Sequence, residues 1–217
     1  MPLALFDLDN TLLAGDSDHA WGQFIVARGL ADADTYGTQN ERFYRDYACG
    51  RLDAVAYQRF CLAPLAGRSV AEIARLHREF MAEFIAPMRL PQADDLLAHH
   101  RQQGDRLLVI TATNRCVAGP IVAGMGIAEL LCTEPQIEND RYTGGLIGEP
   151  CMGEGKVRKL KSWLRTAGET LDGATFYSDS HNDLPLLNTV PRPCAVDPDD
   201  RLREVATQRG WPIISLR

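Results

Sequence analysis

PLALF (residues 2–6) runs directly into DLDNTL (residues 7–12), so that a short apolar stretch ends in two acidic residues. A continuous apolar run without polar alternation is typical of a parallel strand that is covered on both faces of its sheet. In open α/β sheets, ligands bind just beyond the carboxyl ends of such strands. The stretch therefore predicts a buried strand with a candidate functional site at its end.

Asp7 and Asp9 are two residues apart, so on an extended chain both side chains leave on the same side. Two adjacent carboxylates repel each other unless a cation or a proton lies between them. Mg²⁺ fits this need, because it binds one or two carboxylates and shares its other positions with water and substrate phosphate. We therefore expect Asp7 and Asp9 at a Mg²⁺ site, with a solvated acidic turn as the alternative.

The composition limits the class of protein. The 217 residues suffice for one domain that has a sizeable core and carries an insertion, and nothing marks the chain as membrane-spanning. The formal net charge of −6 argues against a broad nucleic-acid-binding surface. The expected partners are therefore small molecules, with no nucleic acid and no membrane, and the oligomeric state is left open.

The cysteines predict the compartment. They form no C-x-x-C pair, and the N-terminal apolar run is too short for a secretory leader. Small buried hydrophobic side chains are the expected role of the six: Cys49, Cys61, Cys116, Cys132, Cys151 and Cys194. We expect a reduced, cytoplasmic protein.

After the first strand the pattern turns helical. Ser17 or Asp18 can cap a first amphipathic helix. Further along, Ser69 and Glu72 have the spacing of a capping box, and the apolar residues behind them predict a helix to about Ala86. These segments predict a small helical bundle.

This bundle, residues 15–87, is expected to form a cap on a core built from residues 1–14 and 88–217. From Pro91 on, strands and helices alternate, which predicts an α/β fold: a Rossmann-like parallel sheet with helices on both faces. The turn residues Asn139-Asp140 also predict a hairpin within 136–147. The remaining expected strands are 106–110, 130–132, 175–177 and 194–196, and the expected helices are 91–104, 117–125, 154–167 and 184–189.

Two further segments carry groups suited to a phosphate. Thr111 follows the strand expected at 106–110, where its hydroxyl and the backbone from Ala112 onward could bind an anion at a helix start. Simple helix capping is the alternative role of Thr111. Lys156 lies in the first turn of a helix, where a cation opposes the helix dipole at a cost of roughly 0.3–1 kcal/mol. An anionic partner would explain Lys156, and an ordinary surface lysine is the alternative.

A last polar segment follows the strand expected at 175–177. Asp179 stands at the end of that strand, and Asn182 with Asp183 begins the next helix. A second strand that ends in an acid indicates a shared site, beyond helix capping alone. His181 is expected at the rim of that site, because Mg²⁺ prefers oxygen ligands to imidazole.

Together, these segments resemble the haloacid dehalogenase superfamily of phosphohydrolases. The resemblance covers the whole chain, and the helical insertion resembles the cap of the branch that contains phosphoserine phosphatase. It rests on four segments in order: Asp7-Leu8-Asp9-Asn10-Thr11, Thr111, Lys156, and Ser178-Asp179 with Asn182-Asp183.

The resemblance implies a Mg²⁺-dependent phosphomonoester hydrolase with an aspartyl-phosphate intermediate. Asp7 would be the nucleophile and Asp9 the general acid and base. Thr111 with Ala112, Lys156 and Asn182 would bind the phosphoryl group. The Mg²⁺ site would be formed or supported by Asp7, Asp9, Asp179 and Asp183.

The resemblance also implies a substrate class. An acidic cap residue nine positions after the nucleophile would recognise a substrate amine, and Asp16 stands there. Capping of the first cap helix is the alternative role of Asp16. The arginine that would bind a substrate carboxylate is replaced by Cys61, with Arg59 nearby as a candidate specificity residue. This departure favours an amine-bearing phosphate such as histidinol phosphate over phosphoserine.

Three alternatives share parts of this pattern. A phosphotransferase or mutase would deliver the aspartyl-phosphate to a second hydroxyl, and its turnover would depend on that acceptor. A non-catalytic phosphoacceptor of the response-regulator kind should lack both the cap and an acid at Asp9. A metal-independent dehalogenase needs neither Asp9 nor Asp179.

Overall fold

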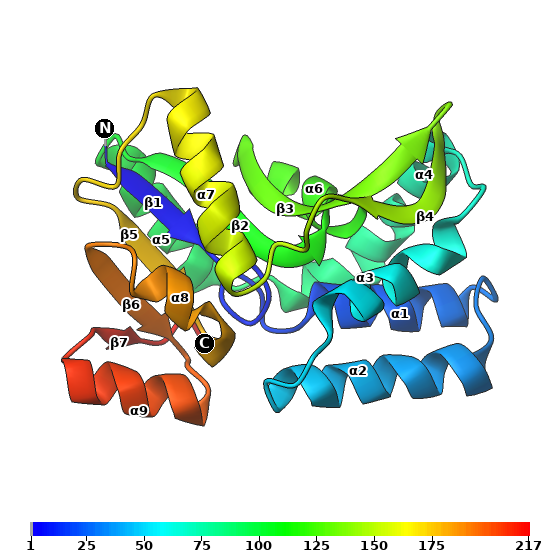
Figure 1. The fold of residues 1–217 in the computed structure, drawn as a ribbon, viewed down its shortest axis with the longest axis horizontal. Helices are drawn as coiled ribbons and strands as arrows, with labels where there is room; N and C mark the ends of the chain where they lie inside the picture. The colour runs from blue at the N-terminus through cyan, green and yellow to red at the C-terminus, as the bar shows by residue number, and fades with distance from the viewer. Residues whose placement is uncertain (1) are drawn as a thin grey trace.

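The computed structural model describes residues 2–217, and one seven-stranded sheet in the order β4-β3-β2-β1-β5-β6-β7 forms its centre (Figure 1). Neighbouring strands are parallel except for β3 and β4, which form an antiparallel hairpin. The apolar N-terminal stretch is the central strand, between β2 and β5. The strands are β1 (Leu3–Phe6), β2 (Arg106–Asn114), β3 (Glu129–Glu138), β4 (Arg141–Ile147), β5 (Thr175–Ser178), β6 (Arg192–Val196) and β7 (Ile213–Ile214).

Strand β1 sends alternate side chains into two hydrophobic clusters, one on each face of the sheet. Ala4 and Phe6 belong to the first cluster, and Leu3 and Leu5 belong to the second. The predicted α/β fold with helices on both faces is therefore confirmed. The first face is covered by α5 (Pro91–Gln102) and α6 (Arg115–Gly124), and the second by α7 (Glu154–Ala167), α8 (Leu184–Leu187) and α9 (Asp200–Arg209).

The segment between β1 and α5 is helical, as the sequence predicts. The capping box is present, because Ser69 accepts from the Glu72 backbone N–H while the Glu72 carboxylate accepts from the Ser69 backbone N–H. Asp16, not Ser17 or Asp18, caps the first helix. The helices are α1 (Ser17–Ala27), α2 (Thr38–Ala48), α3 (Ala54–Leu62) and α4 (Val70–Phe80), and α4 continues as a wider turn (Met81–Ile85) and a tighter one (Ala86–Met88).

Strands β2, β3 and β6 are longer than the sequence pattern indicates. Strand β2 continues past Ile110 to Asn114, because Thr113 and Asn114 are buried and Asn114 pairs with Thr133 of β3. The sequence pattern ends this strand at Ile110, because polar residues follow there. The hairpin is confirmed, with Asn139 and Asp140 at φ 49° and 61° in its turn, and it is formed by the end of β3 with β4. The sequence pattern did not predict α9 and β7, which follow β6.

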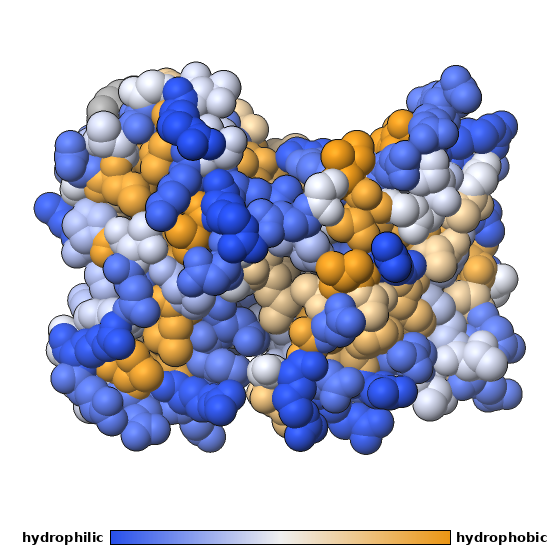
Figure 2. Space-filling view, viewed as in Figure 1, coloured by the Kyte–Doolittle hydropathy of each residue, from blue (hydrophilic) through white to orange (hydrophobic). Residues whose placement is uncertain are grey.

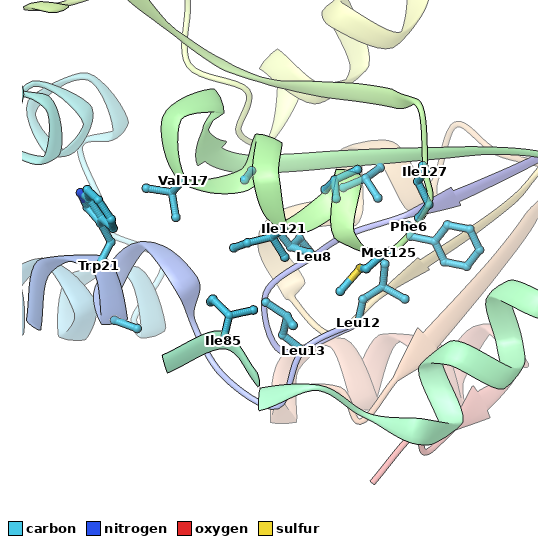
Figure 3. Close-up of a cluster of buried hydrophobic side chains, with 14 of the residues drawn as sticks. Phe6, Leu8, Leu12, Leu13, Trp21, Ile85, Val117, Ile121, Met125 and Ile127 are labelled. Atoms are coloured by element: carbon cyan, nitrogen blue, oxygen red, sulfur yellow. The ribbon is translucent and has the colours of Figure 1, made fainter. Parts of the chain in front are cut away.

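The helical segment packs on the sheet through one continuous apolar layer. Figure 3 shows Leu8 and Leu13, which follow β1, next to Ile121 of α6 and Ile85 of the helical segment. Val117 and then Trp21 lie further along the same layer. This layer holds α1 next to α6 and the end of β2. No helix within residues 2–217 has the length and the apolar character that crossing a lipid bilayer requires.

Candidate active site

One pocket gathers residues from the carboxyl ends of the central strands and from the helical segment that faces them. Segments far apart in the sequence meet here because parallel strands end at the same edge of the sheet. The core side of the pocket includes Asp7, Asp9, Thr111, Ala112, Lys156, Asn182 and Asp183, and the helical side includes Asp16, Phe43, Tyr44, Tyr47, Tyr57 and Gln58.

Lys156 is the centre of the charged network. Its Nζ donates to Asp7 Oδ1 at 2.9 Å and to Asp183 Oδ2 at 2.7 Å, and its side chain is 3% exposed. Burial acts to lower the pKa of Lys156, but the carboxylates of Asp183 and Asp7 raise it above its ordinary value. The side chain is therefore an ammonium. A cation in the first turn of a helix was expected to have an anionic partner, and Asp7 and Asp183 are that partner.

The start of α7 needs glycine to bring Lys156 into place. A Cβ on Gly155 would lie 2.3 Å from the carbonyl oxygen of Pro150, so the helix could not approach that loop with any other residue. Gly153 precedes the helix at φ 53°, in the left-handed region that favours glycine. The Gly153-Glu154-Gly155-Lys156 sequence thus lets the first turn of α7 sit directly against the end of the sheet.

Asp7 lies at the end of β1 and is 4% exposed. Burial raises the pKa of its carboxyl well above the ordinary value, the Lys156 ammonium opposes that rise, and the charges of Asp183, Asp179 and Asp9 add to it. The Lys156 ammonium therefore favours the charged form of the Asp7 carboxyl, and the neighbouring acids disfavour it.

Asp9 is fixed by two donors. Ser17 backbone N–H donates to Oδ1 at 2.7 Å, and Thr113 Oγ1 donates to Oδ2 at 2.6 Å. Burial raises the pKa of the Asp9 carboxyl, and the bonds from Ser17 and Thr113 limit the rise. A raised pKa suits a group that must carry a proton during part of a reaction cycle. Thr113 was not predicted as a site residue, although its spacing of two from Thr111 on one strand puts both side chains on the same side.

Thr111 and Ala112 line the pocket from within β2, which corrects the expected arrangement. Thr111 was expected after the end of the strand, in the segment that starts the next helix, but β2 continues to Asn114 and α6 begins at Arg115. Thr111 Oγ1 accepts from the Thr113 backbone N–H at 3.2 Å instead of capping a helix. Extended backbone, rather than a helix N-terminus, therefore presents these two residues to the pocket.

Asp179 stands beside the main pocket and is tied to the first segment by Thr11. Thr11 Oγ1 donates to Asp179 Oδ1 at 3.0 Å and accepts from the Asp179 backbone N–H at 3.1 Å. Burial and then the charge of Asp183 raise the pKa of Asp179 to about 7. Asp183 also accepts from Ser178 Oγ at 2.8 Å, so the loop after β5 is locked to Lys156 through Asp183.

A second hollow adjoins the main pocket and is lined by Asp179, Asn182, Tyr47 and His181, among others. Figure 2 shows the surface notched between the part of the chain that carries α9 and the part that carries α2. His181 Nδ1 lies 2.7 Å from Asp199 Oδ2 at this edge. His181 is thus at the rim, where the sequence analysis expected it.

The acidic residues fit a divalent cation. The charges of Asp183, Asp179 and Asp9 raise the pKa of Asp7, the charge of Asp183 raises the pKa of Asp179, and the Lys156 ammonium opposes both rises. Within residues 2–217, no group of three or more His, Cys, Asp or Glu side chains has the spacing of a metal site. Mg²⁺ does not require such a group, because one or two carboxylates with other oxygens and water complete its shell.

The helical segment contributes two acids and an amide. Asp16 caps α1 by accepting from the His19 backbone N–H at 2.8 Å and also lines the pocket. Its burial and then the charge of Asp9 raise the pKa of Asp16 to about 7. Asp18 also lines the pocket and accepts from Gln58 Nε2 and Asn114 Nδ2 at 3.3 and 3.2 Å. Capping and pocket lining therefore coexist at Asp16.

Arg59 is the candidate specificity residue that the structure does not bring to the site. It is exposed on α3, outside the pocket, because its neighbour Gln58 occupies the inward face of that helix. Cys61 is buried and does not line the pocket. A role of Arg59 in specificity therefore has no support from the pocket lining, and no sequence pattern distinguished Gln58 from a surface glutamine.

Comparison with known proteins gives the family. Residues 4–188 match the model of the haloacid dehalogenase-like hydrolases. A histidinol-phosphatase of Neisseria meningitidis serogroup C is 48% identical over 99% of both chains. A phosphoserine phosphatase of Mycobacterium tuberculosis is 34% identical over 99% of this chain and 70% of its own length. A Bordetella pertussis protein of unknown function, known from its crystal structure, is 41% identical with a TM-score of 0.93, over 100% of this chain and 99% of its own.

The chain belongs to the haloacid dehalogenase-like hydrolase family. Within that family it is a phosphatase, as are the two named relatives.

Proposed function

We propose that the protein hydrolyses small phosphomonoesters in two steps, through a phosphorylated Asp7. The observation that carries the proposal is the buried contact of Lys156 with Asp7, beside Asp9 and Thr111 in one pocket. A carboxylate nucleophile, an acid within the same pocket and a fixed cation are the groups that phosphoryl transfer needs. Kinetic assays with histidinol phosphate, phosphoserine and p-nitrophenyl phosphate test it.

In the first step, Asp7 Oδ attacks phosphorus and the bond from phosphorus to the ester oxygen breaks. Asp9 gives its proton to the departing alkoxide. Lys156 offsets the repulsion between the anionic nucleophile and the phosphoryl oxygens, and Thr111 with Ala112 and Asn182 orients those oxygens. Ser17 and Thr113 keep the Asp9 carboxyl directed into the pocket.

In the second step, Asp9 takes a proton from water while the water oxygen attacks the phosphorus of the intermediate. The bond between phosphorus and Asp7 Oδ breaks, which releases inorganic phosphate and regenerates the carboxylate. One residue serves as acid and then as base, so each turnover returns Asp9 to its starting state.

Mg²⁺ would be bound by Asp7, Asp179 and the backbone carbonyl of Asp9, with Asp183 supporting the site through Lys156. When bound, the ion supplies positive charge that offsets repulsion between the acids and a phosphate.

Chelation with EDTA is therefore expected to abolish turnover of p-nitrophenyl phosphate, and added Mg²⁺ is expected to restore it. Without the ion, the carboxylates of Asp7, Asp9 and Asp179 would repel the dianionic substrate. Melting curves recorded with and without EDTA show whether the protein stays folded. Undiminished turnover after thorough chelation would contradict the proposed metal dependence.

The proposed substrate is an amine-bearing phosphate without a carboxylate, of which histidinol phosphate is the example. The 48% identical relative is named a histidinol-phosphatase, and Asp16 supplies a carboxylate in the pocket for an ammonium group. An ion pair formed in a closed site is stronger than one on an open surface, because less water screens it.

Asp16→Asn keeps the size of the side chain and its ability to cap α1 but removes the charge. We expect the kcat/KM for histidinol phosphate to fall about tenfold relative to that for p-nitrophenyl phosphate. Asp34→Asn is the matched control, because Asp34 is exposed in the same helical segment. If both substrates change equally in Asp16→Asn, Asp16 acts only as a helix cap.

The helical segment 15–87 serves in this proposal as a cap that excludes bulk water from the site. Its two connections to the core run side by side, since Leu13 bridges Arg89 and the Ala14 N–H donates to the Met88 carbonyl. This supports the boundaries 1–14 and 88–217 for the core. We further propose a cytoplasmic enzyme whose partners are small phosphate esters rather than nucleic acids.

A further inference from the structure

Gln58 of α3 carries a buried acceptor that has no donor among residues 2–217. Its side chain is 2% exposed and lines the pocket. Its Nε2 donates to Asp18 Oδ2 at 3.3 Å and to the carbonyl oxygen of Ala112 at 3.2 Å. Its Oε1 has no hydrogen-bond partner within the described part of the chain. Buried polar atoms are rarely left unpaired, so this oxygen calls for a donor from outside the protein.

The orientation of the Gln58 amide is fixed by its neighbours. A backbone carbonyl can only accept, so the group facing Ala112 O must be the NH₂. Exchanging the amide oxygen and nitrogen would set Oε1 against the Ala112 oxygen and break that bond. The unpaired atom is therefore an acceptor, and the complementary ligand group is an N–H or O–H donor.

The pocket around Gln58 favours nitrogen donors and offers little to a carboxylate. Lys156 is the only Lys or Arg that lines the pocket among residues 2–217, and its Nζ is bonded to Asp7 and Asp183. The helical side adds the Asp16 carboxylate and the aromatic rings of Tyr44 and Tyr57. Carboxylates and aromatic faces both attract an ammonium group.

The anchor of Gln58 also fixes where the donor must be. Nε2 is bonded to the carbonyl of Ala112, which directly follows the proposed phosphate-binding residue Thr111. The amide oxygen shares a carbon with Nε2, so it lies close to the phosphate-binding segment. The donor must therefore be only a few bonds from the ester oxygen, as is the amine of a 2-aminoalkyl phosphate.

We propose that Gln58 is a specificity-determining residue whose Oε1 accepts a hydrogen bond from the ammonium group of a 2-aminoalkyl phosphate, and this inference rests on the phosphatase function proposed above. The ammonium group has three N–H donors, so it can bond Gln58 and Asp16 together. A leaving group with an added carboxylate, as in phosphoserine, finds no Lys or Arg among the described residues that line the helical side of the pocket.

The test compares 2-aminoethyl phosphate with propyl phosphate, which has the same shape and a methyl group in place of the ammonium. The wild-type kcat/KM is expected to favour the amine by about tenfold or more. Gln58→Met keeps the length of the side chain without its polar atoms, and it is expected to lower that preference about tenfold. Gln92→Met on the exposed face of α5 is the matched control and is expected to leave the preference unchanged.

Gln58→Lys provides a second variant, because its ammonium can still donate to Asp18 and Ala112. It removes the acceptor and adds a like charge, so the amine preference is expected to fall further than in Gln58→Met, while phosphoserine gains relative to 2-aminoethyl phosphate. Each preference is a ratio within one protein, which cancels losses from partial unfolding.

The outcomes separate this inference from the proposed function. A wild-type protein inactive on every phosphomonoester overturns the proposed function itself. A wild type that hydrolyses both esters without preferring the amine, or a folded Gln58→Met variant with an unchanged preference, overturns only the role of Gln58. If Gln58→Met does not fold, the wild-type ratio and Gln58→Lys decide in the same way.

Discussion

Asp7→Asn is expected to abolish turnover of every phosphomonoester, with kcat lower by about 10⁴-fold or more, as for other lost nucleophiles. The amide that replaces the carboxylate is a poor nucleophile, and no other carboxylate is held both at the end of β1 and against Lys156. The same variant should form no phosphoenzyme. Acid quenching of a reaction with labelled substrate, followed by recovery of protein-bound phosphate, measures that intermediate directly.

The structural effect of Asp7→Asn should be small enough for this test. Lys156 keeps its bond to Asp183, so its ammonium is not left unpaired, and the substitution removes one of several repelling acids. Asp95→Asn on exposed α5 is the matched control for a change of charge. Protein-bound phosphate in a folded Asp7→Asn variant would show that another residue is the nucleophile.

Asp9→Asn is expected to show a loss that depends on the leaving group. The kcat/KM for an alkyl ester such as histidinol phosphate should fall by about 10²–10⁴-fold, because its alkoxide needs a proton from Asp9. The kcat/KM for p-nitrophenyl phosphate should fall far less, because nitrophenolate leaves without protonation. The value of kcat/KM depends only on the steps up to the phosphorylation of Asp7. It therefore reports the role of Asp9 as acid separately from its later role as base.

The geometry of the Asp9 site suits this substitution. An asparagine can still accept from the Ser17 backbone N–H, and its NH₂ can donate to Thr113 Oγ1. Both hydrogen bonds of the carboxyl can therefore be kept, with the direction of the bond to Thr113 reversed. Trapped phosphoenzyme should accumulate with p-nitrophenyl phosphate, since water is no longer deprotonated. Equal losses of kcat/KM for the two substrates would contradict the assignment of Asp9 as general acid.

The sequence by itself determined the central strand, the alternation that makes a parallel sheet, the helical insertion and the hairpin turn. These features follow from local patterns: an uninterrupted apolar run, a capping box at Ser69, and turn residues at Asn139 and Asp140. It also placed Asp7, Asp9, Thr111, Lys156 and Asp183 at one site, because parallel strands and the helices after them end at one edge. Their catalytic and binding roles remain predictions.

Only the tertiary structure decided which side chains complete the site. Thr113 bonds Asp9 because β2 continues past Ile110, and that extension depends on pairing with β3, a partner distant along the chain. Gln58 lines the pocket while Arg59 faces solvent, because packing sets the rotation of α3 against the sheet. A glutamine beside an arginine gives no local sign of which one is buried. Contacts between segments that are distant in the sequence determine which of the two side chains is buried, and a local sequence pattern does not show those contacts.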